Sequence, residues 1–285
     1  MEKTRLAVMC DFDGTITRKD VGHKIYTQFG DERWEEVNKS WRRGEMSSKD
    51  CLIGEYSFVD ASEQEVRDYV STMEIDTGFV DLVATCRDND IPIAVASDGF
   101  DFYIHALFEK YGLSDIEVFC NEMKFNGRKV ELSFPFYDQG CGVCGNCKRL
   151  HVQKFKDDSR KVVYIGDGLS DRFGARGSDV VFAKGELMEY LMKNNAEFIK
   201  FTNLSEVNSW MMGVLAGDID FPERSALESV PGNQEEDPCQ AVVCSTKDNS
   251  EQEQKKKDDL KKRKMKKRVE KMDDGRYIVY YDFGF

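Results

Sequence analysis

Two aspartates, Asp11 and Asp13, stand one residue apart in the stretch DFDGT, directly after the apolar run of residues 6–10. In an extended chain both carboxylates can face one pocket, and Gly14 frees the backbone to turn away. Carboxylate oxygens are the ligands that a hard divalent ion such as Mg²⁺ prefers. A carboxylate can also attack phosphorus and form an aspartyl phosphate that water hydrolyses. The alternative is a turn with two surface acids, because short motifs also match by chance.

A second polar group, Ser97, Asp98 and Gly99, follows the apolar run of residues 91–96. The serine hydroxyl and the backbone amides of such a segment can hold phosphoryl oxygens. The alternative is a strand-ending turn that binds nothing.

Two further acids, Asp167 and Asp171, lie in the stretch GDGLSD after the apolar run of residues 162–166. Acids at the end of a strand suit a metal site, whereas Asp and Ser at this position also act as ordinary helix caps. Lys148 precedes the segment that leads into this run, and alone it would be read as a surface lysine. The order of these groups along the chain is what indicates that they belong to one site.

The apolar runs that precede these groups predict the fold. Residues 6–10, 91–96 and 162–166 are short, bounded by polar turns and separated by helix-length segments. This pattern predicts buried parallel strands of a doubly wound α/β sheet, which residues 180–183 and 198–201 would extend. Because ligands bind beyond the carboxyl ends of such strands, the polar groups are expected to meet at one edge.

Insertions and appended segments are expected around this core. Residues 15–79 carry many charges, with aromatic residues at helical spacing, and predict a helical cap inserted after the first strand. Residues 116–125 and 129–134 predict a hairpin across Asn126-Gly127, a type I′ signal. The predicted divisions are a catalytic core (1–14 and 80–216), the cap (15–79), an acidic linker (217–250), a Lys-rich helical or disordered segment (251–271) and a short strand-like tail (272–285).

Composition narrows the class of protein. The chain has 285 residues, 40% of them hydrophobic, which is enough for a packed interior, and no run long enough to span a membrane. Nine cysteines without a signal peptide predict reduced thiols and a cytoplasmic location. The net charge of -12 makes nucleic-acid binding by the main body unlikely. The Lys-rich segment leaves open a weak contact with nucleic acid or with an acidic partner, and the strand-like tail predicts docking on the core or on another subunit.

The four groups taken in order resemble the haloacid dehalogenase superfamily, whose motifs are DxDGT, a Ser or Thr after a strand, a Lys and an acidic GDxxxD motif. The resemblance covers residues 5–210. The early cap insertion is similar to the phosphoserine phosphatase branch. The phrases CDFDGTIT, SDGFDFYI and CGNCKR resemble the methionine-salvage phosphatases that act on 2-hydroxy-3-keto-5-methylthiopentenyl-1-phosphate.

This resemblance implies a Mg²⁺-dependent phosphomonoesterase and a role for each matching residue. Asp11 would be the nucleophile, and Asp13 would protonate the leaving oxygen and then activate water. The phosphoryl group would be held by Ser97, Asp98, Gly99 and Lys148. The Mg²⁺ ligands would be Asp11, Asp167 and the backbone carbonyl of Asp13, with Asp171 and Gly168 in support. Asp171 would orient Lys148 or a metal-bound water.

The first cap residues are candidates for substrate selection. In this branch they face the active site, which implicates Asp20 and His23 in reading the substrate's polar groups. Phosphoserine phosphatases have a glutamate where this chain has Asp20, so the contact with a substrate amine is in doubt. The alternatives are an acid at a helix start and a structural histidine.

Cys141, Cys144 and Cys147, with His151 four residues on, offer four soft ligands. Their spacing is compatible with a structural zinc site or, less well, with an iron–sulfur site, which would need a fourth cysteine. The alternative is a cysteine-rich loop without metal, as in the similar salvage phosphatases.

The sequence leaves three candidate functions. The first is a phosphatase of a small phosphorylated metabolite. The second is a phosphoserine phosphatase or another phosphatase or phosphotransferase on the same core, although a cap of this size argues against macromolecular substrates. The third is a scaffold whose basic tail mediates interactions.

Overall fold

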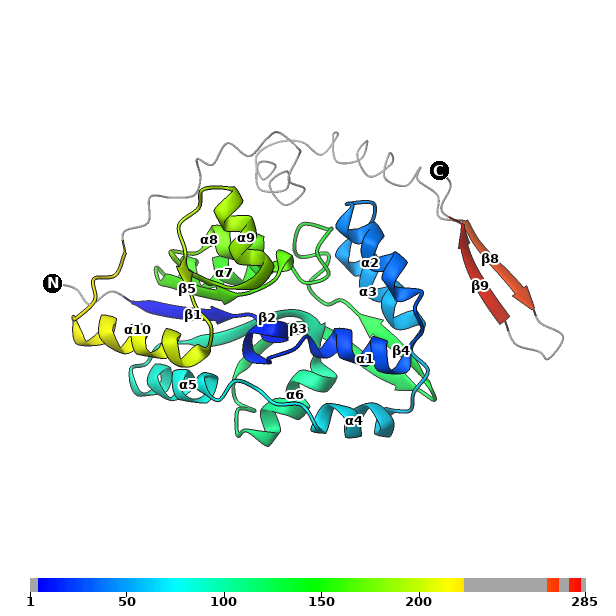
Figure 1. Cartoon of the computed structure of the whole chain (residues 1–285), viewed down its shortest axis with the longest axis horizontal. Helices are drawn as coiled ribbons and strands as arrows, with labels where there is room; N and C mark the ends of the chain where they lie inside the picture. Colours follow the sequence, from blue (N-terminus) through cyan, green and yellow to red (C-terminus); the bar gives the residue numbers. More distant parts are fainter. Residues whose placement is uncertain (1–4, 223–265, 272–276, 283–285) are drawn as a thin grey trace. The chain divides into compact units, whose positions relative to one another are not determined.

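A seven-stranded sheet organises most of the protein, with the strand order β4-β3-β2-β1-β5-β6-β7 (Figure 1). The structure is a computed structural model that describes residues 5–222, 266–271 and 277–282. The strands are β1 (Leu6–Cys10), β2 (Ile93–Phe100), β3 (Glu117–Asn126), β4 (Lys129–Ser133), β5 (Lys161–Gly166), β6 (Val180–Ala183), β7 (Ile199–Lys200), β8 (Lys266–Lys271) and β9 (Tyr277–Asp282). The helices are α1 (Val21–Phe29), α2 (Trp34–Arg42), α3 (Ser48–Ser57), α4 (Glu63–Ser71), α5 (Gly78–Asp88), α6 (Asp101–Lys110), α7 (Lys148–Asp157), α8 (Arg172–Gly177), α9 (Gly185–Lys193) and α10 (Leu204–Ala216), with short turns η1 (Phe12–Ile16) and η2 (Leu169–Asp171).

Strand β1 lies at the centre of the sheet, parallel to β2 on one side and to β5 on the other. All five residues of β1 are buried. Val8 and Cys10 join the hydrophobic cluster on one face, and Met9 joins the cluster on the other face. This two-sided burial explains the unbroken apolar run and confirms the predicted doubly wound parallel sheet. The chain reverses its direction of strand addition at β1, which places a crevice at its carboxyl end.

Helices cover both faces of the sheet. Figure 1 shows α5, α6 and α10 on one face and α7, α8 and α9 on the other. Leu82, Leu107 and Val207 pack into the first cluster, and Val152 and Leu187 into the second. Within the described residues, no helix is long and apolar enough to cross a membrane.

Helices α1–α4 fill most of the segment predicted as a cap. The two linkers that lead into and out of this segment meet at a bridge between Thr17 and Ile75. A backbone hydrogen bond from Asp76 to the carbonyl of Ile16 (2.7 Å) adds to this contact. Paired linkers of this kind place both ends of the helical insertion beside the carboxyl end of β1.

Strands β3 and β4 form the predicted hairpin, but its turn differs from the expected one. Asn126 still pairs with Lys129, so the two-residue turn is Gly127-Arg128. Only Gly127 has a positive φ (62°). A positive φ at the first turn residue alone fits a type II′ turn, whereas type I′ needs it at both.

Contacts divide the chain into two units, Met1–Cys239 and Gln240–Phe285. In the second unit β8 and β9 form an antiparallel pair. The expectation of a helical or disordered segment over residues 251–271 is therefore wrong for residues 266–271, because pairing with the Tyr-rich β9 outweighs local lysine composition. The rest of that segment, residues 223–250 of the predicted acidic linker, and residues 272–276 and 283–285 of the tail lie outside the described residues.

Candidate active site

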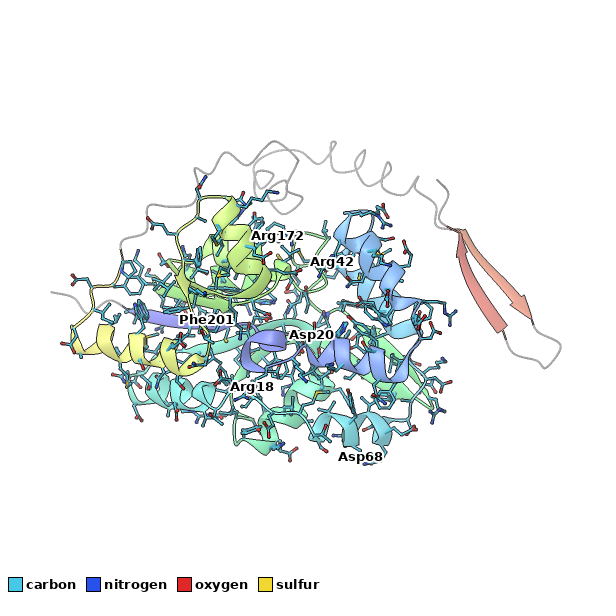
Figure 2. The ribbon with its side chains drawn as sticks, in the orientation of Figure 1. Arg18, Asp20, Arg42, Asp68, Arg172 and Phe201 are labelled. Atoms are coloured by element: carbon cyan, nitrogen blue, oxygen red, sulfur yellow. The ribbon has the colours of Figure 1, made fainter. Side chains whose placement is uncertain are left out.

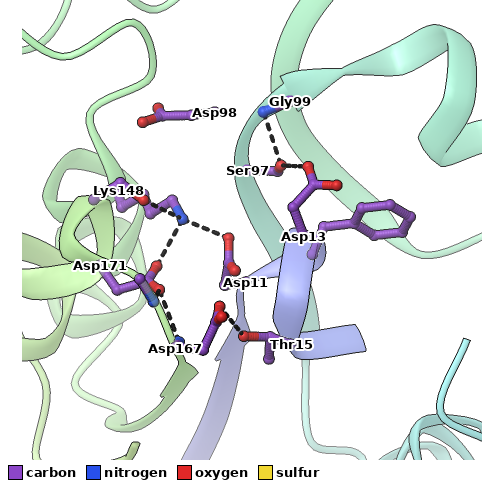
Figure 3. A network of polar contacts seen from close by, with 12 residues as sticks. Asp11, Asp13, Thr15, Ser97, Asp98, Gly99, Lys148, Asp167 and Asp171 are labelled. Carbon is purple, nitrogen blue, oxygen red and sulfur yellow. Dashed lines mark hydrogen bonds and ion pairs between the residues drawn. The ribbon is translucent and has the colours of Figure 1, made fainter. Parts of the chain in front are cut away.

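A buried ion cluster lies where β1 ends (Figure 3). The Nζ atom of Lys148 lies 2.5 Å from Asp11 Oδ1 and 2.6 Å from Asp171 Oδ1, and all three side chains are at most 5% exposed. Burial alone would lower the pKa of Lys148, but Asp11 and Asp171 outweigh it and raise the pKa well above its ordinary value. Lys148 is thus a fixed cation beside Asp11, not the surface lysine of the simplest interpretation.

Asp171 is the anchor of this cluster. Its Oδ1 accepts a hydrogen bond from the hydroxyl of Tyr164 (2.6 Å), and its Oδ2 accepts from the backbone N–H of Asp167 (3.0 Å) and of Gly168 (2.9 Å). Both oxygens are therefore engaged by groups of the protein. This supports the predicted orientation of Lys148 by Asp171 and gives Gly168 its supporting role through its backbone.

One group of carboxylates within the described part of the chain has the spacing of a cation site. Oxygens of Asp11, Asp167 and Asp171 lie within 4.8 Å of one another. Because Asp171 is held as just described, Asp11 and Asp167 are the oxygens suited to an ion. Asp167 is positioned by the hydroxyl of Thr15 (2.9 Å). A Cβ at Gly14, which has φ +78°, would overlap the Asp167 carboxylate. The hard oxygen donors fit a divalent cation such as Mg²⁺.

Asp13 is held beside this cluster by groups from three elements. Its Oδ1 accepts from the backbone N–H of Val21 (2.8 Å), and its Oδ2 accepts from the hydroxyl of Tyr103 (2.9 Å) and lies 3.5 Å from Ser97 Oγ. Burial, with the nearby charge of Asp20, raises the pKa of Asp13 to about 8. A carboxyl group that stays protonated near neutral pH is suited to act as a general acid.

The phosphate-binding candidates on β2 do not form a simple strand-ending turn. Strand β2 runs on to Phe100, and its register against β3 shifts between Ala96 and Phe100. The backbone N–H of Gly99 donates to Ser97 Oγ (2.9 Å), which fixes the hydroxyl beside Asp13. The carboxylate of Asp98 accepts instead from the backbone N–H of Asn146 (3.1 Å), so only its backbone is suited to a phosphate.

The predicted cysteine and histidine metal site is not formed. His151 Nε2 lies 2.6 Å from Asn146 Oδ1, and its ring stacks on Phe119 at a centroid distance of 4.2 Å. Burial lowers the pKa of His151 to about 3, so the imidazole is neutral. Among the described residues, the acidic group above is the one set of three or more potential ligands close enough for a metal. His151 on α7 is instead engaged by Asn146 and Phe119.

Asn146 ties the cysteine loop to two strands. Its side-chain amide donates to the backbone carbonyls of Ser97 (2.8 Å) and Phe119 (2.7 Å). Asn146 is 1% exposed and precedes Lys148 by two residues. The loop therefore sets the spacing between Lys148 and Ser97, the two side chains predicted to hold a phosphoryl group.

A cavity of about 490 Å³ joins this edge of the sheet to the cap. Asp20 and His23 both line it, as the sequence suggested. Asp20 also caps α1, accepting from the backbone N–H of His23 (2.7 Å), and His23 Nδ1 lies 3.1 Å from the hydroxyl of Tyr26. The capping role and the position in the cavity are thus both present, and Figure 2 shows Asp20 at the start of α1.

Four residues of the site escaped sequence reasoning: Thr15, Tyr103, Asn146 and Tyr164. Each contacts a predicted residue through a hydrogen bond that depends on the fold. Thr15, Tyr103 and Asn146 lie inside the motif phrases, although the partners of Asn146 come from the distant strands β2 and β3. Tyr164 gives no local signal, because nothing in an apolar strand marks its hydroxyl as the partner of Asp171.

Carboxylates after β1, a hydroxyl in β2, a buried lysine on α7 and acids after β5 meet at one sheet edge, and this arrangement defines a phosphatase of the haloacid dehalogenase type. A family model described as Putative Phosphatase matches residues 6–215, and the chain belongs to this family. A 2-hydroxy-3-keto-5-methylthiopentenyl-1-phosphate phosphatase of Lysinibacillus sphaericus is 33% identical over 190 residues, covering 64% of this chain and 83% of that protein. The phosphatase of the same name from Brevibacillus brevis is 29% identical over 189 residues, covering 65% and 85%.

Solved structures share the fold. A phospho-aspartyl intermediate analogue of phosphoserine phosphatase superposes with a TM-score of 0.58 at 20% identity, covering 73% of this chain and 99% of that one. A phosphoserine phosphatase from T. onnurineus gives a TM-score of 0.55 at 17% identity, covering 74% and 97%. The predicted superfamily is confirmed.

Proposed function

We propose that the protein is a Mg²⁺-dependent hydrolase of small phosphomonoesters that works in the cytoplasm and uses Asp11 as its nucleophile. The observation that carries this proposal is the placement of Lys148 between Asp11 and Asp171, with Asp13 beside them at the mouth of a cavity. A fixed cation, a carboxylate nucleophile and a protonated carboxyl group are the parts that phosphoryl transfer needs.

In the first step, a carboxylate oxygen of Asp11 bonds to phosphorus while the bond between phosphorus and the ester oxygen breaks. Asp13 gives its proton to that leaving oxygen. Lys148 and the hydroxyl of Ser97, with the backbone of Asp98 and Gly99, hold the phosphoryl oxygens. In the second step, Asp13 takes a proton from water, the water oxygen bonds to phosphorus, and Asp11 leaves as a free carboxylate.

The residues present fit a divalent cation. Asp11 and Asp167 would hold it with the backbone carbonyl of Asp13, and Asp167 is steadied by Thr15. When bound, the ion would neutralise charge on the phosphoryl oxygens. Asp171 and Gly168 act outside this ligand set, because both are committed to the anchor of Lys148.

A small metabolite is the proposed substrate. The cavity volume of about 490 Å³ lies in the range of small-molecule sites, and helices of the cap line it. The similarity to relatives named for 2-hydroxy-3-keto-5-methylthiopentenyl-1-phosphate makes this compound the first candidate. Phosphoserine is the second candidate, because the fold is shared with phosphoserine phosphatases, and Asp20 in the cavity wall stands where those enzymes have a glutamate.

The test is hydrolysis of p-nitrophenyl phosphate with Mg²⁺ by the wild type and by Asp11→Asn. We expect a loss of at least 10³-fold in kcat, because the amide is a poor nucleophile. Asp81→Asn, on the outer surface of α5, is the matched control and should keep full activity. Wild-type turnover by the Asp11→Asn variant would refute the proposal. It would leave the scaffold function, in which the basic tail binds partners, as the better explanation.

A further inference from the structure

One buried acid in the cap has no part in the mechanism above. Glu55 lies on α3, lines the cavity and is 3% exposed. Among the described residues between 18 and 75, it is the one charged side chain that is buried. Burying a carboxylate costs free energy unless hydrogen-bond donors or a positive charge compensate. The role of Glu55 in the cavity wall therefore depends on which groups contact its carboxyl group.

The protein supplies only neutral donors to Glu55. The Asn38 side-chain amide donates to Oε1 (3.0 Å), and Cys51 and Tyr26 also form hydrogen bonds to the carboxyl group. Burial raises the pKa of Glu55 to about 7 despite these contacts. The ionised form is thus only partly compensated by the protein, although a carboxylate has about four acceptor positions.

The cations that line the cavity are already paired. Lys148 contacts Asp11 and Asp171, and Arg42 contacts Glu186 (2.7 Å) across from the cap to the core. Figure 2 shows Arg42 at the end of α2. Around Glu55 the wall is aromatic instead, since the rings of Tyr26 and Tyr56 meet at 5.7 Å and both line the cavity. No lysine, arginine or histidine among the described residues forms an ion pair with Glu55, so a ligand in the cavity is a source of a further donor.

We propose that Glu55 is a specificity-determining residue that accepts a hydrogen bond from a donor group, a hydroxyl or an ammonium, on the non-phosphate end of the substrate. This inference rests on the proposed function, because it takes the phosphate end of the substrate to lie at Asp11. The proposal adds a polar substrate contact from the cap to the contacts made by the residues of the four motifs. It also predicts that esters with a purely apolar tail are poor substrates.

The experiment compares matched alkyl phosphates of two to four carbons that end in a methyl, hydroxyl, ammonium or ketone group. We expect at least one chain length at which the hydroxyl or ammonium ester exceeds its methyl analogue tenfold in kcat/KM. Comparison of the hydroxyl ester with the ammonium ester identifies the group that donates to Glu55. A preference for the ketone would assign the opposite role, with Glu55 as donor, and would overturn the proposal.

The variant test is Glu55→Gln, which keeps the size of the side chain and removes its charge. We expect the preference for donor-bearing esters to fall at least fivefold, with turnover of p-nitrophenyl phosphate within twofold of wild type. Glu63→Gln, on the exposed surface of α4, is the matched control and should keep the preference. An unchanged preference in the Glu55→Gln variant would overturn the assignment.

The two proposals fail in different ways. If the wild type hydrolyses no ester at all with Mg²⁺, the phosphatase function itself fails. If p-nitrophenyl phosphate is hydrolysed but no chain length separates donor-bearing from methyl esters beyond threefold, only the role of Glu55 fails. The wild-type panel gives this answer even if the Glu55→Gln variant does not fold.

Discussion

The two walls of the cavity are built in different ways. On the core side, Asp11, Lys148 and Asp171 form a closed set of ion pairs in which each charge has a partner at 2.5 to 2.6 Å. On the cap side, Glu55 lies among aromatic rings with neutral donors alone. A fixed cluster suits chemistry that is the same for every phosphate ester, whereas an incompletely compensated acid suits the part that changes between substrates.

The largest effect should come from breaking the core side. Lys148→Met removes the cation and leaves Asp11 and Asp171 buried together without compensation. We expect kcat for p-nitrophenyl phosphate to fall at least 10³-fold and the free energy of unfolding to fall by about 3 kcal/mol. Lys154→Met, at an exposed position of the same helix, should change both by little. Near-normal turnover in the Lys148→Met variant would show that the cluster is structural.

A smaller effect should come from Asn146, which positions two core residues without contacting substrate. Asn146→Ala leaves the carbonyls of Ser97 and Phe119 without their donor, so we expect a loss of about 2 to 3 kcal/mol in stability. Because Ser97 and Lys148 would lose their spacing, inhibition by vanadate should weaken at least tenfold. Asn208→Ala, another buried asparagine on α10, controls for stability alone. Equal vanadate inhibition in both variants would mean that Asn146 only supports the fold.

These two residues also mark where sequence reasoning succeeds and where it stops. Lys148 was predictable because its order among the motifs carries the signal, and β1 was predictable because burial on both faces leaves an unbroken apolar run. Asn146 was not predictable, since its role depends on β2 and β3 carbonyls that no local pattern reveals. His151 was misassigned for the same reason: spacing placed it with the cysteines, while its helix turns it toward Phe119. Strand β8 escaped because its lysine-rich sequence does not favour a strand, although β9 follows it closely in the chain.

On the cap side, Glu55 should make the free energy of unfolding depend on pH. The pKa of Glu55 is raised to about 7 in the folded protein, against about 4.3 in an unfolded chain. The folded state therefore holds this proton more tightly, and the stability linked to it is lost as the pH rises from about 4.5 through 7. Glu55→Gln removes this dependence. Urea unfolding at pH 5 and pH 8 should show the wild type losing up to about 3 kcal/mol relative to the variant. Parallel pH curves would mean that the carboxylate is compensated in some other way.

The smallest effect should come from the ion pair that joins the two walls. Arg42 on α2 and Glu186 on α9 meet at 2.7 Å, with side chains 48% and 44% exposed. An exposed pair contributes about 0 to 1 kcal/mol, so Arg42→Met should change stability by less than 1 kcal/mol. Its distinctive consequence is kinetic, because this pair spans cap and core, whereas the similarly exposed pair of Arg43 and Glu45 lies within the cap. If cap opening limits product release, Arg42→Met should raise kcat by up to about threefold, and Arg43→Met should leave it unchanged. Salt should reproduce the effect in the wild type, since screening weakens exposed pairs. Equal kcat in both variants at all salt concentrations would mean that the two walls do not separate during turnover, and that the difference between them is one of recognition alone.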